Sequence, residues 1–201
     1  IRMGFEIAET RNGAPADGVR RVSCIDKSNV TRGCQLFRST FDEVASDYPA
    51  TEADYGYIDA FMQWITRSPE HYDTVVTSNM FGDISTDLGA VLQGGMGMAA
   101  SGNIGDEHAF FEPVHGSAPK HAGKNKVNPI ASINSIQMMM DYLGRKTNDD
   151  DLIAVGHLID ESVADHLKHG KMLTYDIGGT ASCSDVGISI AERLATKLKE
   201  R

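Results

Sequence analysis

Two aspartates, Asp83 and Asp87, lie four residues apart in the stretch TSNMFGDISTDLGAVLQGG, which consists largely of Met, Ile, Leu, Ala and Gly. On a helix this spacing places both carboxylates on one face, with Cβ atoms roughly 5–6 Å apart. Like charges so close repel each other, most strongly where they are partly buried. Oxygen ligands in this pattern suit a hard divalent cation, Mg²⁺ or Mn²⁺. Spacing alone is also compatible with two solvated acids near a helix N-terminus.

Three other motifs carry groups that could act on a small anionic substrate. Lys27, in DKSNV, follows an expected strand, where α/β folds build their sites, and its amine could accept a proton. Asp59, in YGYID, opens an expected helix. The loop EPVHGSAPKHAGKNKVNP combines glycine, two histidines and three lysines, and could cradle an anion. Taken alone, each motif is also typical of an ordinary solvated surface.

An alternating series of strands and helices must position these residues, so the expected fold class is α/β. YDTVVTSN predicts a buried parallel strand, because β-branched residues follow one another without polar alternation. VRRVSCI is a second expected strand, and Ala109–Phe111 is a short third one. The glycine-rich stretch GGMGMAASGNIGD is expected to cross between two lobes. Helices are expected at the start of the chain, after YDTVVTSN, over residues 34–47, 58–67, 130–144 and 150–169, and up to Arg201.

Side-chain patterns also predict the caps and buried faces of these helices. Ser28 or Asn29 is expected to cap the helix over residues 34–47, and Ser184 or Asp185 the final helix. Apolar spacing predicts two core stripes: Leu36, Phe37, Phe41, Val44 and Ala45 in the first helix, and Ile130, Ile133, Ile136, Met139 and Met140 in the helix over 130–144.

Composition limits the protein class and its partners. The chain has 201 residues, 41% hydrophobic and 23% charged, which is typical of a soluble globular protein of one or two domains. A net charge of −9 disfavours binding to nucleic acid or anionic membranes. Cys24, Cys34 and Cys183 show no C-x-x-C spacing, which favours reduced thiols and a cytoplasmic location. The chain opens at Ile1 inside an expected helix, without a methionine, so we expect the later part of a longer protein.

Taken in order, DKSNV, YID, SNMFGDISTD, EPVHGSAPKHAGKNKVNP and DIGG resemble the β-decarboxylating dehydrogenases, which include 3-isopropylmalate, isocitrate, homoisocitrate and tartrate/D-malate dehydrogenases. The resemblance covers nearly the whole chain from about Phe5, and NMFGDISTD and EPVHGSAP are long and specific. It implies an isopropylmalate dehydrogenase-like two-domain fold. Residues 1–94 would form a central dimerisation and substrate–metal domain. Residues 95–201 would form the C-terminal part of a cofactor-binding domain.

The resemblance further implies an active site shared between the subunits of a homodimer. Asp83 and Asp87 of one subunit would bind Mg²⁺ or Mn²⁺ together with Asp59 of the partner subunit. Lys27 would also cross the interface and take the hydroxyl proton of a malate-type 2-hydroxy acid, which loses hydride to NAD(P) and then CO₂. The cation would act as Lewis acid and template. The tyrosine that protonates the enolate, and the arginines that clamp the carboxylates, would lie upstream of Ile1.

The same resemblance assigns residues to the cofactor: Asn79 near the nicotinamide, Asn128 beside the adenine, and the loop residues Glu112, His115, Gly116, Ser117 and Ala118. NAD-using members generally carry an aspartate directly after HGSAP, where it accepts hydrogen bonds from the ribose. Here that position is Lys120, which cannot accept one but could pair with a phosphate. We therefore expect NADP to be preferred over NAD. The residues expected around its 2′-phosphate are Lys120, His121, Val127 and Tyr175.

The substrate stays open at this point. DKSNV and NMFGDISTD look most like isopropylmalate dehydrogenase, whereas the NADP-like loop favours isocitrate, and homoisocitrate and tartrate/D-malate remain alternatives. A different class of alternative is a noncatalytic fragment or subunit that keeps the fold. The presence of Lys27 and of the metal aspartates argues against a noncatalytic subunit. From about Gly94 onwards, strands are expected to lack parallel neighbours and to expose sheet edges.

Overall fold

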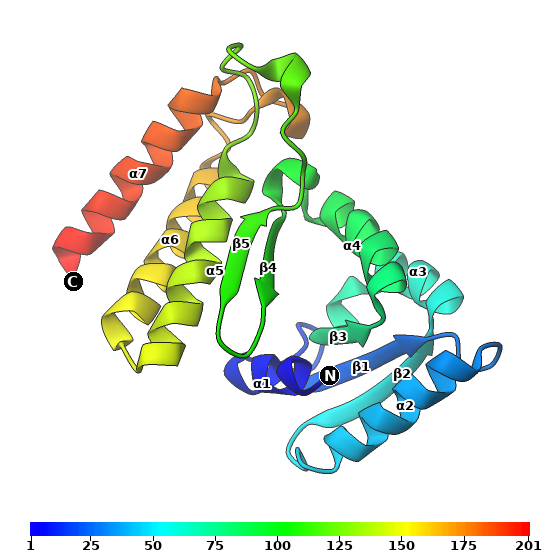
Figure 1. Cartoon of the computed structure of the whole chain (residues 1–201). Coiled ribbons are helices and arrows are strands. Elements are labelled where there is room, and N and C mark those ends of the chain that lie inside the picture. The colour runs from blue at the N-terminus through cyan, green and yellow to red at the C-terminus, as the bar shows by residue number, and fades with distance from the viewer. The chain divides into compact units, whose positions relative to one another are not determined.

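The computed structural model describes residues 1–201 and divides the chain into two compact units, Ile1–Gly89 and Ala90–Arg201 (Figure 1). Each unit contains a hydrophobic core cluster of its own. The expected α/β class is confirmed, because the first unit alternates strands and helices around a parallel sheet. None of the helices combines the length and apolar character needed to cross a bilayer.

The first unit is built on a three-stranded parallel sheet in the order β2-β1-β3. The central strand β1 (Arg21–Asp26) pairs with β2 (Glu52–Tyr57) on one side and β3 (Thr74–Thr77) on the other. All six residues of β1 are buried, as expected of a parallel strand covered on both faces. Three helices contact this sheet: α1 (Arg2–Thr10), α2 (Arg32–Ala45) and α3 (Ile58–Arg67). The 3₁₀ turn η1 (Pro69–His71) precedes β3, and α4 (Asn79–Gln93) follows it.

Aromatic packing closes the core of the first unit. Phe5 of α1 and Phe41 of α2 are completely buried, and their ring centroids lie 5.3 Å apart. Tyr48 stacks on Phe5 at 4.9 Å. Val22 and Cys24 of β1 complete the cluster, and burial raises the pKa of the Cys24 thiol to about 12. This thiol therefore stays protonated and acts as a small apolar side chain.

Truncating the buried ring of Phe41 should destabilise the first unit strongly. Phe41→Ala leaves a cavity between α1, α2 and the sheet, and we expect the free energy of unfolding to fall by about 3–5 kcal/mol. Urea denaturation followed by the fluorescence of Trp64, the only tryptophan in the chain, reports on this unit. Leu36→Ala is the matched control, because Leu36 lies on the same helix but is 69% exposed. Its effect should stay within about 0.5 kcal/mol, and equal losses in both variants would contradict this core.

The second unit packs three helices beside an antiparallel hairpin (Figure 1). The helices are α5 (Ile130–Thr147), α6 (Asp150–His169) and α7 (Cys183–Glu200), and the strands are β4 (Ala100–Ile104) and β5 (Ala109–Pro113). Helix α5 contacts α6 and both strands, and α6 contacts α7. The core cluster is Met98, Ile130, Val163, Val186 and Ile190. Short 3₁₀ turns, η2 (Met96–Met98), η3 (Pro119–His121) and η4 (Tyr175–Ile177), lie in the connections.

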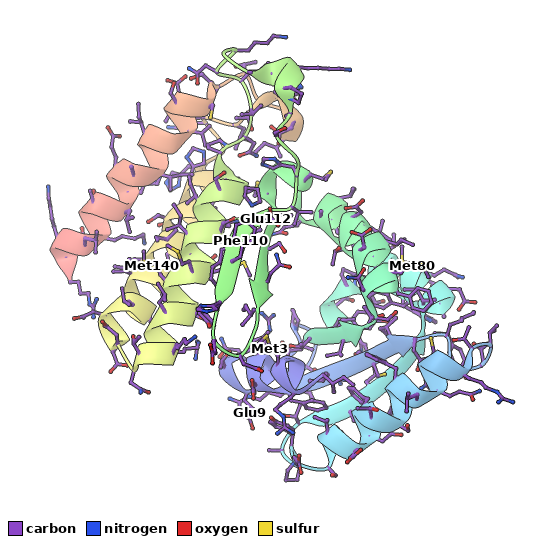
Figure 2. All side chains as sticks on the ribbon, in the orientation of Figure 1. Met3, Glu9, Met80, Phe110, Glu112 and Met140 are labelled. Carbon is purple, nitrogen blue, oxygen red and sulfur yellow. The ribbon has the colours of Figure 1, made fainter.

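The glycine-rich stretch after α4 is more ordered than expected. It contains η2 and the strand β4, which pairs with β5, whereas only a crossing segment was predicted. Small residues permit this pairing, since a Cβ atom at Gly102 would lie only 3.0 Å from the ring of Phe111 opposite. On β5, Phe110 and Glu112 project from one side of the hairpin and are both exposed (Figure 2).

Several helix details also differ from the expectations. Thr31, and neither Ser28 nor Asn29, caps α2 by accepting a hydrogen bond from the Cys34 N–H. The N-cap of the final helix is Ser182, two residues before the predicted Ser184, and it forms a reciprocal capping box with Asp185, the other predicted capping residue. Two predicted core residues are exposed, Leu36 at 69% and Ile136 at 47%. Because a helix turns by about 100° per residue, Leu36 faces away from the stripe that Phe37 and Phe41 define.

Candidate functional site

Lys27 and Asp59 meet at the carboxyl end of the parallel sheet. Lys27 directly follows β1, and Asp59 is the second residue of α3, which begins where β2 ends. The two strands are in register there, with Asp26 opposite Tyr57. Lys27 Nζ consequently lies 2.6 Å from Asp59 Oδ1, and this hydrogen bond lowers the pKa of the Asp59 carboxyl. The amine also lies 5.9 Å from the centre of the Tyr57 ring.

A buried ion pair fixes the turn that carries Lys27. Asp26 is almost completely buried and accepts two hydrogen bonds from the Arg38 guanidinium, at 2.8 and 2.9 Å. The same carboxylate accepts the Ser28 N–H at 3.0 Å. These hydrogen bonds fix the residues on both sides of Lys27. Its side chain therefore extends from the end of the sheet in a defined position.

Asp83 and Asp87 lie one turn apart on α4, and both are exposed. Ser85, between them, is buried, so the two acids share the solvent-facing side of the helix. No group of three or more metal-ligating side chains converges within the chain. Two carboxylates leave most positions around Mg²⁺ to water, to a substrate or to another chain.

A cavity of about 710 Å³ lies in the second unit, a volume that suits a cofactor-sized ligand. Eight residues that were predicted to contact the cofactor line it: His115, Gly116, Ser117, Ala118, His121, Val127, Asn128 and Tyr175. Three others do not. Asn79 is the first residue of α4, Glu112 projects from the hairpin beside Phe110 (Figure 2), and Lys120 is exposed on η3.

Glycines and one strained alanine shape the wall of this cavity. Gly94 and Gly95 line it with φ angles of 122° and 113°, which side-chain-bearing residues rarely adopt. Ala118 takes a left-handed φ of 46° at the start of η3. Ala118 was among the predicted cofactor residues, whereas Gly94 and Gly95 were not, although the Gly-Gly pair was a visible signal of an unusual backbone.

The amide of Asn128, which lines the cavity, is fixed by hydrogen bonds. Its nitrogen donates to Asp176 Oδ2 at 3.1 Å, and its oxygen accepts the Ile130 N–H at 3.0 Å. Asp176 is the only acidic residue that lines the cavity, and it was not among the predicted cofactor residues. Its position next to Tyr175, at the start of the DIGG motif, was the signal that could have found it.

Two basic side chains contact the ring of Tyr175, which lines the cavity. The His121 ring is stacked at a centroid distance of 6.2 Å. Lys126 Nζ lies 4.2 Å from the ring centre, within the range of a cation–π contact. Lys126 was not among the predicted cofactor residues.

Residues 1–190 match the family model described as isocitrate/isopropylmalate dehydrogenase. The chain belongs to this family. It is 44% identical to a homoisocitrate dehydrogenase from Methanocaldococcus jannaschii, over 99% of this chain and 53% of that protein. It is 38% identical to a 3-isopropylmalate dehydrogenase from Methanothermobacter thermautotrophicus, over 90% of this chain and 53% of that protein.

Solved structures agree with this family assignment. A β-decarboxylating dehydrogenase from Thermococcus kodakarensis, in its apo form, superposes with a TM-score of 0.84 and 37% identity, over 98% of this chain and 54% of that one. The resemblance to β-decarboxylating dehydrogenases is thus confirmed for the family and the fold. The chain spans about half the length of the relatives described here.

Proposed function

We propose that the protein catalyses metal-dependent oxidative decarboxylation of a malate-type 2-hydroxy acid, with 3-isopropylmalate as the first candidate substrate and NADP as the hydride acceptor. The observation that carries this proposal is the Lys27–Asp59 pair, 2.6 Å apart at the carboxyl end of the sheet in a member of this family. Lys27 is the group that we assign to accept the substrate hydroxyl proton, and Asp59 holds the amine in place.

Asp83 and Asp87 fit a divalent cation by their chemistry. Hard oxygen ligands on successive turns of one helix face suit Mg²⁺ or Mn²⁺, and both side chains are accessible. A bound cation would neutralise the two acids and polarise the substrate hydroxyl and carboxylate. Asp59 would be the third ligand, and its lowered pKa favours the ionised form that a cation needs.

The proposed homodimer brings these groups into one site. Lys27 and Asp59 of one chain would complete the pair of acids on α4 of its partner. Exposed apolar side chains accompany those acids on the same helix: Met80 (Figure 2) is 63% exposed, and Ile84 is 56% exposed. A helix face that combines accessible apolar groups with ligand acids is suited to burial against a second copy.

The cofactor preference follows from the loop after β5. Lys120 occupies the position where NAD-using members generally carry an aspartate, and His121 and Tyr175 line the cavity nearby. We expect kcat/KM to be higher with NADP than with NAD by about tenfold or more, because a charge-assisted hydrogen bond to phosphate has no counterpart in NAD. Steady-state kinetics with both cofactors measures this ratio. A higher kcat/KM with NAD would end the NADP proposal.

A substrate panel tests the reaction itself. With Mn²⁺ present, 3-isopropylmalate, isocitrate, homoisocitrate and D-malate are compared by the absorbance of the reduced nicotinamide. Isocitrate is the second candidate, because the lysine after HGSAP favours an NADP-type loop. Turnover of none of these acids would support the alternative of a noncatalytic fragment or subunit.

A further inference from the structure

We infer that Lys126 determines the preference for NADP, as a phosphate-binding residue that Tyr175 holds ready at the rim of the cavity. The inference rests on the proposed function, in which NADP is the hydride acceptor. It adds Lys126, which the motif order did not predict, to the residues expected around the 2′-phosphate.

The contact between Lys126 and Tyr175 is the first observation. The distance of 4.2 Å from Nζ to the ring centre is the shortest cation–π contact in the chain, where the others span 5.2–5.9 Å. The ring itself lines the cavity. A lysine side chain normally loses considerable rotamer freedom when it binds a ligand. Resting on the ring, this one is already partly ordered beside the cavity.

The backbone around Lys126 is clamped to the start of α7. Asn125 donates from its amide to Ser184 Oγ at 2.8 Å, and its Oδ1 accepts the Ser184 N–H at 3.0 Å. Its carbonyl accepts the Cys183 N–H at 2.9 Å. On the other side of Lys126, Asn128 is buried and hydrogen-bonded. The lysine therefore projects from a short, fixed segment, although its own side chain is exposed.

The charges around the Tyr175 ring favour a compact anion. Lys126 contributes a positive charge, and His121 stacks on the same ring. The opposing charge is Asp176, one oxygen of which is taken up by the Asn128 amide. The 2′-phosphate of NADP carries close to two negative charges, whereas NAD has an uncharged hydroxyl at that position. A lysine point charge therefore discriminates between the two cofactors.

Binding of cofactor fragments tests the inference without turnover. Calorimetry compares 2′,5′-ADP, which carries the 2′-phosphate, with 5′-AMP, which lacks it. Lys126→Met keeps the length of the side chain but removes the charge, and should weaken 2′,5′-ADP by about tenfold while 5′-AMP binding is unchanged. Lys126→Arg retains the charge and should restore most of the affinity for 2′,5′-ADP.

Lys124→Met is the matched control, since Lys124 lies on the same loop and is also exposed. It should leave the ratio of the two affinities almost unchanged. The inference is overturned if Lys126→Met leaves 2′,5′-ADP binding intact, weakens both fragments equally, or has no larger effect than Lys124→Met. If the unmodified protein does not prefer 2′,5′-ADP, the proposed NADP preference fails as well. If Lys126→Met still prefers 2′,5′-ADP over 5′-AMP, only the role of Lys126 is refuted, and the proposed NADP preference stands.

Discussion

Asp83→Asn should abolish turnover and weaken Mn²⁺ binding by about a hundredfold or more. Mutating a residue that only hydrogen-bonds to a metal ligand typically lowers metal affinity by about 10–100-fold, and losing a ligand itself should cost more. The asparagine keeps the shape of the side chain but removes the charge that offsets a divalent cation. Asp87→Asn should behave in the same way, since both acids share one face of α4. Calorimetric titration with Mn²⁺ measures the affinity directly and does not depend on activity.

Asp47→Asn is the control for the loss of one negative charge. Asp47 is exposed and belongs to the same unit, but it lies on the turn after α2. It should change Mn²⁺ affinity only through long-range electrostatics, which physiological salt largely screens. Unchanged Mn²⁺ affinity and turnover in Asp83→Asn would show that Asp83 is not a metal ligand, and the same result in Asp87→Asn would exclude α4 from the site.

Lys27→Met should lower kcat by roughly 10²–10⁴-fold while Mn²⁺ affinity stays close to that of the unmodified protein. Methionine matches the unbranched shape of the lysine side chain but cannot accept a proton. The more informative variant is Lys27→Arg, since a guanidinium keeps the positive charge and does not deprotonate in proteins. We expect Lys27→Arg to be as inactive as Lys27→Met.

The outcome for Lys27→Arg separates two roles of the amine. If the arginine variant keeps most of its turnover, Lys27 acts through its charge, and proton transfer at this residue is ruled out. Lys171→Met, an exposed lysine outside the first unit, controls for the general loss of a surface cation. Steady-state kcat and Mn²⁺ titrations on the same preparations give both readouts.

Mixing two inactive variants tests whether the site is shared between chains. A dimer of one Lys27→Met chain and one Asp83→Asn chain contains one doubly damaged site and one intact site. Random assortment by unfolding and refolding the mixture together should then restore about a quarter of the original turnover, as expected for two equivalent sites in a twofold dimer. A site contained within one chain cannot be restored in this way, so no recovery would refute the shared arrangement.

The sequence predicted those parts of the fold that depend on local periodicity. The helix over residues 58–67 was predicted with its observed bounds, and the parallel strand YDTVVTSN contains β3. The strand β4 escaped prediction because it is rich in small residues and is stabilised by pairing with β5, a contact that no local pattern encodes. Leu36 was misplaced because apolar spacing marks a stripe but does not fix its edges.

In the site, too, residues within a motif were predicted, whereas contacts between residues far apart in the sequence were not. Motif order located Lys27 and Asp59 separately, but their contact depends on the parallel register of β1 and β2. Likewise, most of the loop residues that line the cavity were predicted, because they are consecutive in the sequence. Lys126 was missed, since its significance arises from packing on Tyr175, which lies far away along the chain.

The outer strands of the first sheet have a consequence for handling the protein in concentrated solution. Neither β2 nor β3 has a partner on its outer side within the sheet, so each can offer backbone donors and acceptors to another molecule. β2 carries Glu52 and Asp54, whose charges oppose stacking of copies, whereas β3 consists of uncharged Thr and Val. We therefore expect aggregation through strand pairing to begin at the segment Thr74–Thr77, and a single lysine substituted there should reduce it most.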